Sequence, residues 1–233
     1  MNTLMKKKNE SSEQLNIQLF LLCMLAALLC RRLGKISSLR IICGMLRTLI
    51  YVGVYIGWGI SIYKRVIQKS VRNVLIFIAE LIIFWFVVRT TKYFFTMDNQ
   101  IARYLWYSYY IPMLFIPVAV LQAAFFLGKS EEYRLPKWLK GVYIPTAVLV
   151  LLVLSNDLHQ LVFSFPVGSA WSDSHYTYGW GYYVVLVWEV VSALTAFVLM
   201  IYKCRHSQKK KYLPLLGIGA AVLYAVLFIN GVA

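Results

Sequence analysis

Acidic residues are scarce in this chain, and charged residues of either sign are few. Among 233 residues there are 9 Asp and Glu against 24 Lys and Arg, and only 14% of the chain is charged. Soluble domains carry about 25% charged residues, so an ordinary soluble domain is excluded. The chain is instead 61% hydrophobic and 16% aromatic. This composition predicts an all-α membrane protein, a polytopic bundle of transmembrane helices.

Cysteine and catalytic motifs are also sparse. The four cysteines have no CxxC or paired spacing, which predicts free, buried thiols rather than a disulfide framework or a metal site; they are Cys23, Cys30, Cys43 and Cys204. The sequence contains no Gly-rich phosphate loop, no GxSxG and no HExxH. We therefore expect no enzyme activity and no cofactor in this chain.

Basic residues dominate the charge, with a formal net charge of +15. A charge of this size could indicate a nucleic-acid partner, but the lysines and arginines fall in clusters between apolar runs. That pattern is typical of membrane loops that meet anionic lipid. The predicted partner is the lipid bilayer, with no nucleic acid.

Long apolar runs divide the chain into about seven candidate membrane spans. A spanning helix needs about 20 apolar residues. The candidates are residues 15–31, 46–63, 73–91, 104–128, 139–157, 180–202 and 212–232. We expect residues 1–14 to form a basic N-terminal tail and residues 15–233 to form one transmembrane domain.

The distribution of Lys and Arg predicts the orientation of these spans. Residues 203–211 are strongly basic and are predicted to be cytoplasmic, whereas residues 163–179 contain no Lys or Arg and are predicted to lie outside. Alternation then places residues 32–45 outside, although that loop is basic. An alternative is that the first segment does not span and that residues 32–45 form a cytoplasmic amphipathic stretch. The last segment would end outside.

A polar cluster, SNDLHQ, closes the apolar run that ends near residue 154. One interpretation is an ordinary helix end, whose free carbonyl groups need partners. The other is an extracytoplasmic pocket formed with the aromatic run at 176–183. The candidate ligand-sensing residues are Asn156, Asp157, His159, Trp171, Asp173, His175, Tyr178 and Trp180.

Two further roles of this cluster were weighed. Its Asp and His side chains are ligand types that suit zinc, but Asp-x-His spacing alone is weak support, so no metal is expected. Histidine titrates between pH 5 and 8, which leaves pH sensing open.

Two carboxylates, Glu80 and Glu189, lie in the middle of apolar segments. An ionised carboxylate at the bilayer centre costs roughly 2.5–3.5 kcal/mol on insertion scales. Each must therefore face the bundle interior, be protonated, or pair; Arg47 and Arg103 are candidate partners. We predict either hydrogen-bonded protonated side chains or coupling elements between the outer pocket and the cytoplasmic side.

Prolines are few, 6 in all, and three of them lie inside the fourth and fifth predicted spans. Pro112 and Pro117 lie in the fourth segment and Pro145 in the fifth. Because proline cannot donate the helical hydrogen bond, each is expected to kink its helix.

The order of these features resembles a known family. ARYLWYSYYIPMLFIP, LGKSEEYRLPKWLK and LVLSNDLHQLVF follow one another, before an aromatic helix and a basic loop. Residues 46–233 thereby resemble the N-terminal seven-transmembrane sensor region of bacterial sensor histidine kinases. In that family a helix ends in an outward-facing T-N-D/E-x-H motif, which Ser155, Asn156, Asp157 and His159 match with Ser in place of Thr.

The resemblance implies a signal-sensing protein of a two-component system in the bacterial plasma membrane. Its ligand would be small and either extracytoplasmic or membrane-soluble. Family members continue into kinase domains that this sequence does not contain, so we expect a truncated receptor or a sensor-only protein without kinase activity. A homodimer or a separate kinase partner would supply the output.

Two alternatives remain. The intramembrane carboxylates and kinked helices suit a small proton-coupled transporter or permease, although we find no convincing internal repeat. A purely structural subunit is the other alternative, in which the polar cluster is only a helix end.

Overall fold

The computed structural model describes the chain in segments that fall into two compact units. The described residues are 2–36, 39–94, 99–130, 132–166, 175–205, 217, 221, 222 and 225. The units comprise Met1–Trp58 and Gly59–Ala233, whereas the sequence pattern suggested one domain over residues 15–233. Each unit is described by itself.

The first unit consists of α1 (Asn2–Leu33) and most of α2 (Arg40–Arg65). The backbone of residues 2–14, predicted to be a tail, is helical and continuous with the first apolar segment. Because α1 continues to Leu33 and α2 begins at Arg40, residues 32–45 do not form a separate amphipathic helix. A pocket of about 260 Å³ at the end of α1 is lined by Leu28, Arg31, Arg32 and Lys35.

Five described stretches are long and apolar enough to cross a membrane. They are Arg40–Arg65, Lys69–Tyr93, Gln100–Phe126, Lys137–Leu154 and Trp180–Arg205. Each contains or overlaps one of the predicted segments from the second to the sixth, so the prediction of an all-α integral membrane protein is confirmed. The seventh predicted segment, 212–232, lies almost wholly outside the described residues.

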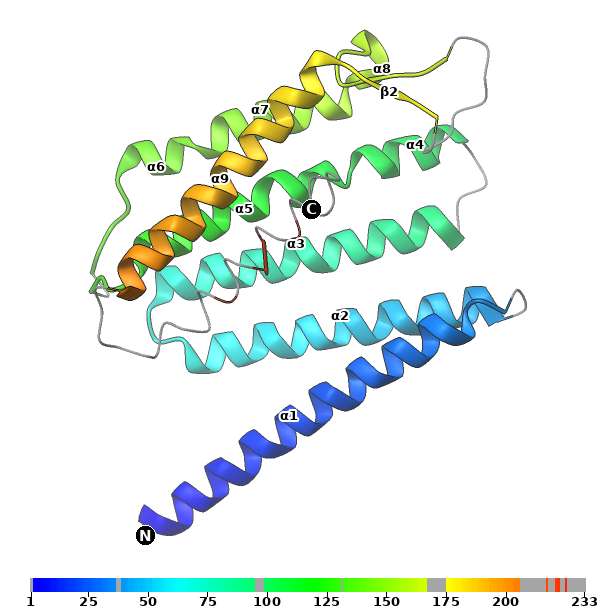
Figure 1. Ribbon diagram of the computed structural model, residues 1–233. Coiled ribbons are helices and arrows are strands. Elements are labelled where there is room, and N and C mark those ends of the chain that lie inside the picture. The colour runs from blue at the N-terminus through cyan, green and yellow to red at the C-terminus, as the bar shows by residue number, and fades with distance from the viewer. Residues whose placement is uncertain are drawn as a thin grey trace. The chain divides into compact units, whose positions relative to one another are not determined.

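Helix α5 (Tyr110–Phe126) is the centre of the second unit. It packs against α3 (Lys69–Phe94), α7 (Tyr143–Leu154) and α9 (Trp180–Arg205), and Figure 1 shows it running between them. Its sequence, YIPMLFIPVAVLQAAFF, is apolar on all sides. A helix of that kind is stable when it is covered all round, which explains why most of α5 is buried.

Two of the three prolines lie next to breaks between helices. The fourth segment divides into α4 (Asn99–Tyr107) and α5, with Ser108 and Tyr109 between them. Pro112 therefore lies in the first turn of α5, and Pro145 lies in the first turn of α7. First-turn N–H groups have no intrahelical acceptor, so proline there breaks no bond and favours a helix start. Among the prolines that the structure describes, Pro117 lies in a helix interior.

The chain between α7 and α9 is described for residues 155–166 and 175–179. It contains α8 (Asn156–His159), β1 (Phe163–Ser164) and β2 (Thr177–Tyr178). The two strands pair antiparallel, with Phe163 opposite Tyr178 and Ser164 opposite Thr177. The short α6 (Lys137–Gly141) precedes α7 at the other end of the bundle.

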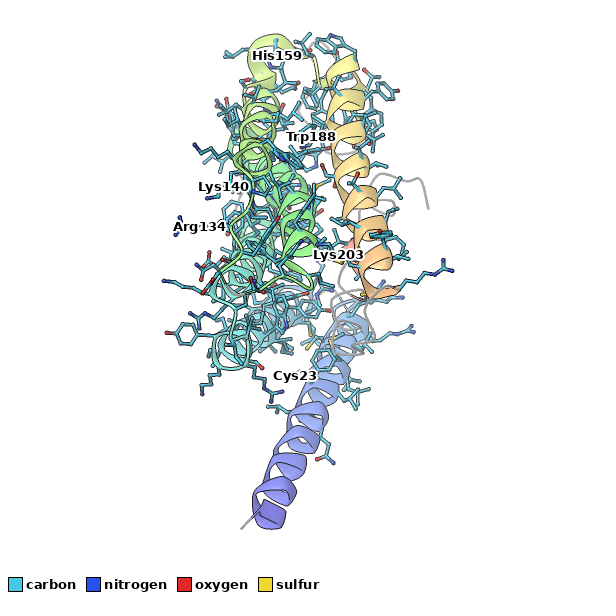
Figure 2. The ribbon with its side chains drawn as sticks, turned by 90° about the vertical axis from the view of Figure 1, so that its left-hand side faces the viewer. Cys23, Arg134, Lys140, His159, Trp188 and Lys203 are labelled. Atoms are coloured by element: carbon cyan, nitrogen blue, oxygen red, sulfur yellow. The ribbon has the colours of Figure 1, made fainter. Side chains whose placement is uncertain are left out.

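Two side-chain hydrogen bonds join the central helices. The indole Nε1 of Trp188 on α9 donates to Oγ1 of Thr146 on α7, at 3.1 Å, and Figure 2 shows Trp188 partway along the bundle. The hydroxyl of Tyr143 on α7 donates to Oε1 of Gln122 on α5, at 3.0 Å. Such bonds contribute roughly 0.6 kcal/mol each within membranes, so they fix the relative register of the helices more than they stabilise the bundle.

Candidate functional site

Asn156 is the centre of the polar cluster and is fully buried. Its Oδ1 accepts hydrogen bonds from the backbone N–H groups of Val162 and Phe163, both at 3.0 Å. Its Nδ2 donates to the Phe163 carbonyl at 2.8 Å and to the Tyr107 hydroxyl at 3.1 Å. The amide therefore holds the chain that leaves α8 and ties it to α4, and it has no free capacity for a ligand.

Asp157 joins the same network through α4. Its Oδ2 forms an ion pair with Nη2 of Arg103 at 2.8 Å, and its Oδ1 accepts a hydrogen bond from the Tyr107 hydroxyl at 2.8 Å. Arg103, Tyr107, Asn156 and Asp157 are called the Asn156 cluster below. The cluster connects α4 to α8, and only its Arg103–Asp157 pair reaches the surface, with side-chain exposures of 26% and 18%.

Arg103 has a buried donor without a partner in the described part of the chain. Its Nε is buried and has no hydrogen-bond partner among the described residues. A buried N–H without an acceptor costs about 1–3 kcal/mol, and such groups are rare in native proteins. The guanidinium edge is therefore a feature that stability does not explain.

His159 turns away from the Asn156 cluster. Its Nδ1 accepts a hydrogen bond from the backbone N–H of Leu161 at 3.0 Å, so the ring proton of the neutral form lies on Nε2. Nε2 lies 3.1 Å from the Leu152 carbonyl and 3.3 Å from Oγ of Ser155. Nε2 therefore contacts the end of α7, and Nδ1 holds the chain that follows α8.

The aromatic run packs against itself around Phe163, which is fully buried. Ring centroids 4.7–6.3 Å from that of Phe163 belong to Trp106, Tyr107, Tyr110, Tyr176, Tyr178 and Tyr182. Aromatic pairs at such distances stabilise by about 0.5–1.5 kcal/mol beyond the burial of their area. In the described residues this part of the predicted pocket is a packed cluster, and it supports the Asn156 cluster from one side.

The remaining predicted site residues divide into two groups. His175, Tyr178 and Trp180 are exposed on or beside the turn that leads into α9, and the Tyr178 ring stacks on Tyr182 at 4.0 Å. Trp171 and Asp173 lie outside the described residues. Of the eight predicted ligand-sensing residues, the structure brings Asn156 and Asp157 into one hydrogen-bonded cluster.

The two intramembrane carboxylates differ. Glu189 is buried in the bundle and interacts electrostatically with Tyr110 and Tyr182. Glu80 is exposed on α3 among the described residues. Arg103, a predicted partner for these carboxylates, instead pairs with Asp157.

Potential metal ligands do not gather in the described residues, where no group of three or more His, Cys, Asp or Glu side chains could hold an ion. Cys43 is buried, the other three cysteines are half-buried, and all four are free thiols.

Lys203, on the last turn of α9, binds the end of α5. Its Nζ donates to the carbonyls of Ala124, Phe125 and Leu127 at 3.0, 2.8 and 3.2 Å. Carbonyls at a helix C-terminus lack the regular partner four residues later, although that of Ala124 also accepts from the Leu127 N–H at 3.3 Å, and a cation there interacts favourably with the helix dipole. Figure 2 shows Lys203 and His159 at opposite ends of α9 and α7. Lys203 therefore clamps α9 to α5 far from the Asn156 cluster.

We expect Lys203→Met to lower the free energy of unfolding by about 2 kcal/mol, because hydrogen bonds from a charged group contribute about 1.5–3 kcal/mol. Thermal unfolding of the purified protein in detergent measures the change. Arg205→Met is the matched control, because Arg205 is exposed two residues later. Equal effects of the two substitutions would contradict the clamp.

Arg103 and Tyr107 were missed as members of the site. They lie four residues apart on α4, so they share a helix face. In the sequence, this Arg and this Tyr lie at the start of the fourth predicted segment. That start is predicted to lie on the same side of the membrane as Asp157. That pattern was the available signal for a polar network at this end of the bundle.

The comparison with known families gives one match. The family model described as "N-terminal 7TM region of histidine kinase" matches residues 39–232. No curated protein matches the chain, and no solved structure matches it.

Proposed function

Because the chain belongs to the family of the N-terminal 7TM region of histidine kinases, we propose that it receives a signal for a two-component system in the bacterial plasma membrane. The signal acts at the Asn156 cluster on the extracytoplasmic side, and the output is a change in a histidine kinase, carried by this protein or by a partner. The chain itself transfers no phosphoryl group.

The observation that carries this proposal is the Arg103–Asp157 ion pair. It is the part of the Asn156 cluster that reaches the surface, and it joins α4 to α8, elements that are distant in sequence. A ligand that alters this pair changes the contact between the two elements. Since α4 leads into α5, and α5 packs along α9, the change has a continuous packed route to the opposite end.

The transporter alternative rests on buried carboxylates. Glu189 is buried, but Glu80 is exposed in this chain, so the described residues do not build a relay from both. Uptake into proteoliposomes that collapses with Glu189→Gln would favour transport over sensing.

Asp157→Asn tests the sensor proposal. It removes the charge that pairs with Arg103 and keeps the side-chain shape, so we expect the transcripts that change on deletion of the gene to change in the Asp157→Asn strain as well. Transcript profiling of the two strains and the parent measures this, with the amount of protein in the membrane determined in parallel.

Glu132→Gln is the control, because Glu132 is exposed in the segment between α5 and α6. It should leave the transcripts at parental levels. A parental profile in both the Asp157→Asn strain and the deletion strain would refute the proposal.

A further inference from the structure

One buried polar atom of the Asn156 cluster has no hydrogen-bond partner among the described residues, and it is a donor. Both the amide oxygen and the amide nitrogen of Asn156 are fully used in hydrogen bonds. Each oxygen of Asp157 has a partner. The buried Nε of Arg103 has none among the described residues. A group that binds here must therefore accept hydrogen bonds, which favours an anion over a cation or a metal ion.

The geometry of the guanidinium narrows the class of anion. Nε and the η nitrogens form a planar fork that matches two oxygens of a carboxylate. Asp157 occupies this fork through one oxygen at Nη2, while its other oxygen is directed to Tyr107. The fork is thus only partly filled, and its filled position is already held by a carboxylate.

The net charge of the ligand distinguishes a carboxylate from a phosphate at this site. A carboxylate adds one negative charge beside Asp157, whereas phosphate near neutral pH carries up to two. The site contains one cation, Arg103, paired with one carboxylate, so a second negative charge is accommodated more easily than a third. The Arg103 side chain is 26% exposed although its Nε is buried, so a small molecule meets the exposed part of the side chain first and reaches Nε only by displacing Asp157.

We propose that Arg103 binds the carboxylate of a small monoanionic ligand, which competes with Asp157 for the guanidinium. This inference rests on the proposed function and names the chemical class of its signal. Binding weakens the Arg103–Asp157 pair and so loosens α4 from α8. Asp157 acts as an internal competitor that occupies the fork when no ligand is bound.

The test uses the full chain in nanodiscs with ¹⁵N-labelled arginine, titrated with sodium acetate at constant ionic strength. We expect a saturable shift of one Nε–H resonance, which is missing from the spectrum of Arg103→Lys. Asp157→Asn should tighten acetate binding by about tenfold, because it removes the competing charge. A merely structural Asp157 would give no such gain.

Two controls accompany the titration. Arg89→Lys, which changes an exposed arginine near the end of α3, should leave the shifting resonance in place. Inorganic phosphate should bind more weakly than acetate. Equal or tighter binding of phosphate would overturn the carboxylate assignment.

An Nε–H resonance of Arg103 that does not respond to acetate in the wild-type protein would overturn the proposal without any variant. If the wild-type protein does not bind acetate but the transcripts still change in the Asp157→Asn strain, this inference alone is refuted. If the protein binds acetate but no transcript changes in the Asp157→Asn strain, the proposed function is refuted and the carboxylate-binding site is retained.

Discussion

Replacing Asn156 by alanine is expected to lower the free energy of unfolding by about 4 kcal/mol. Asn156 is fully buried, and its amide serves two backbone N–H groups, one carbonyl and the Tyr107 hydroxyl. Alanine leaves these groups without partners in a buried position, where each unsatisfied group costs about 1–3 kcal/mol. Thermal and chemical unfolding of the purified protein in detergent measure the loss.

Asn156→Asp separates the role of the amide oxygen, which accepts hydrogen bonds, from that of the amide nitrogen, which donates them. Aspartate keeps the acceptor for Val162 and Phe163 but cannot donate to the Phe163 carbonyl or to Tyr107, and it buries a charge beside Asp157. We therefore expect it to be destabilising as well. Asn73→Ala is the matched control, because Asn73 is exposed on α3. An Asn156→Ala protein as stable as the control would show that the network does not hold the turn.

Gly179→Ala has the second largest expected effect. A Cβ at residue 179 would lie 2.1 Å from the Leu161 carbonyl oxygen and 2.7 Å from its carbon. These are backbone atoms, and Gly179 itself donates to the Val162 carbonyl at 2.9 Å, so the backbone at Leu161 and at Gly179 must move apart. Overpacking typically costs about 1–3 kcal/mol; we expect about 3 kcal/mol, or roughly 10 °C in Tm.

Gly141→Ala is the control for this substitution. A Cβ at Gly141 meets nothing within 4 Å, and alanine favours a helix over glycine by up to about 1 kcal/mol. The control should therefore be neutral or slightly stabilising. If Gly179→Ala unfolds at the same temperature as Gly141→Ala, the close approach of Gly179 to Leu161 is not a constraint in the folded protein.

The membrane class, the helical fold and the family could be predicted from the sequence because they depend on apolar run length and motif order. The orientation of helix faces could not. Glu80 is surrounded in sequence by apolar residues, as in IFIAELIIFW, so no contrast between faces showed which side of α3 is covered. Glu189 has similar neighbours, VLVWEVVS, yet it is buried.

The roles of the prolines and of the polar motif were harder to predict from the sequence, for a different reason. Whether proline kinks a helix or begins one depends on where the helix starts, and the sequence placed the starts of the fourth and fifth segments several residues away from Pro112 and Pro145. In SNDLHQ, four polar residues of similar character have separate partners. Asn156 holds the turn, Asp157 pairs with Arg103, and His159 binds the end of α7. These assignments depend on contacts from α4 and the turn, which local pattern does not reveal.

The attachments of α9 limit how it can move. At one end the N–H groups of Gly179 and Gly181 donate to the carbonyls of Val162 and Leu161, each at 2.9 Å, and at the other Lys203 holds three carbonyls of α5. Sliding α9 along its axis by one turn, about 5.4 Å, would break all five bonds at once. A tilt of α5 and α9 together keeps these five hydrogen bonds. Translation of α9 alone along its axis is therefore a more costly way to transmit a signal than such a tilt.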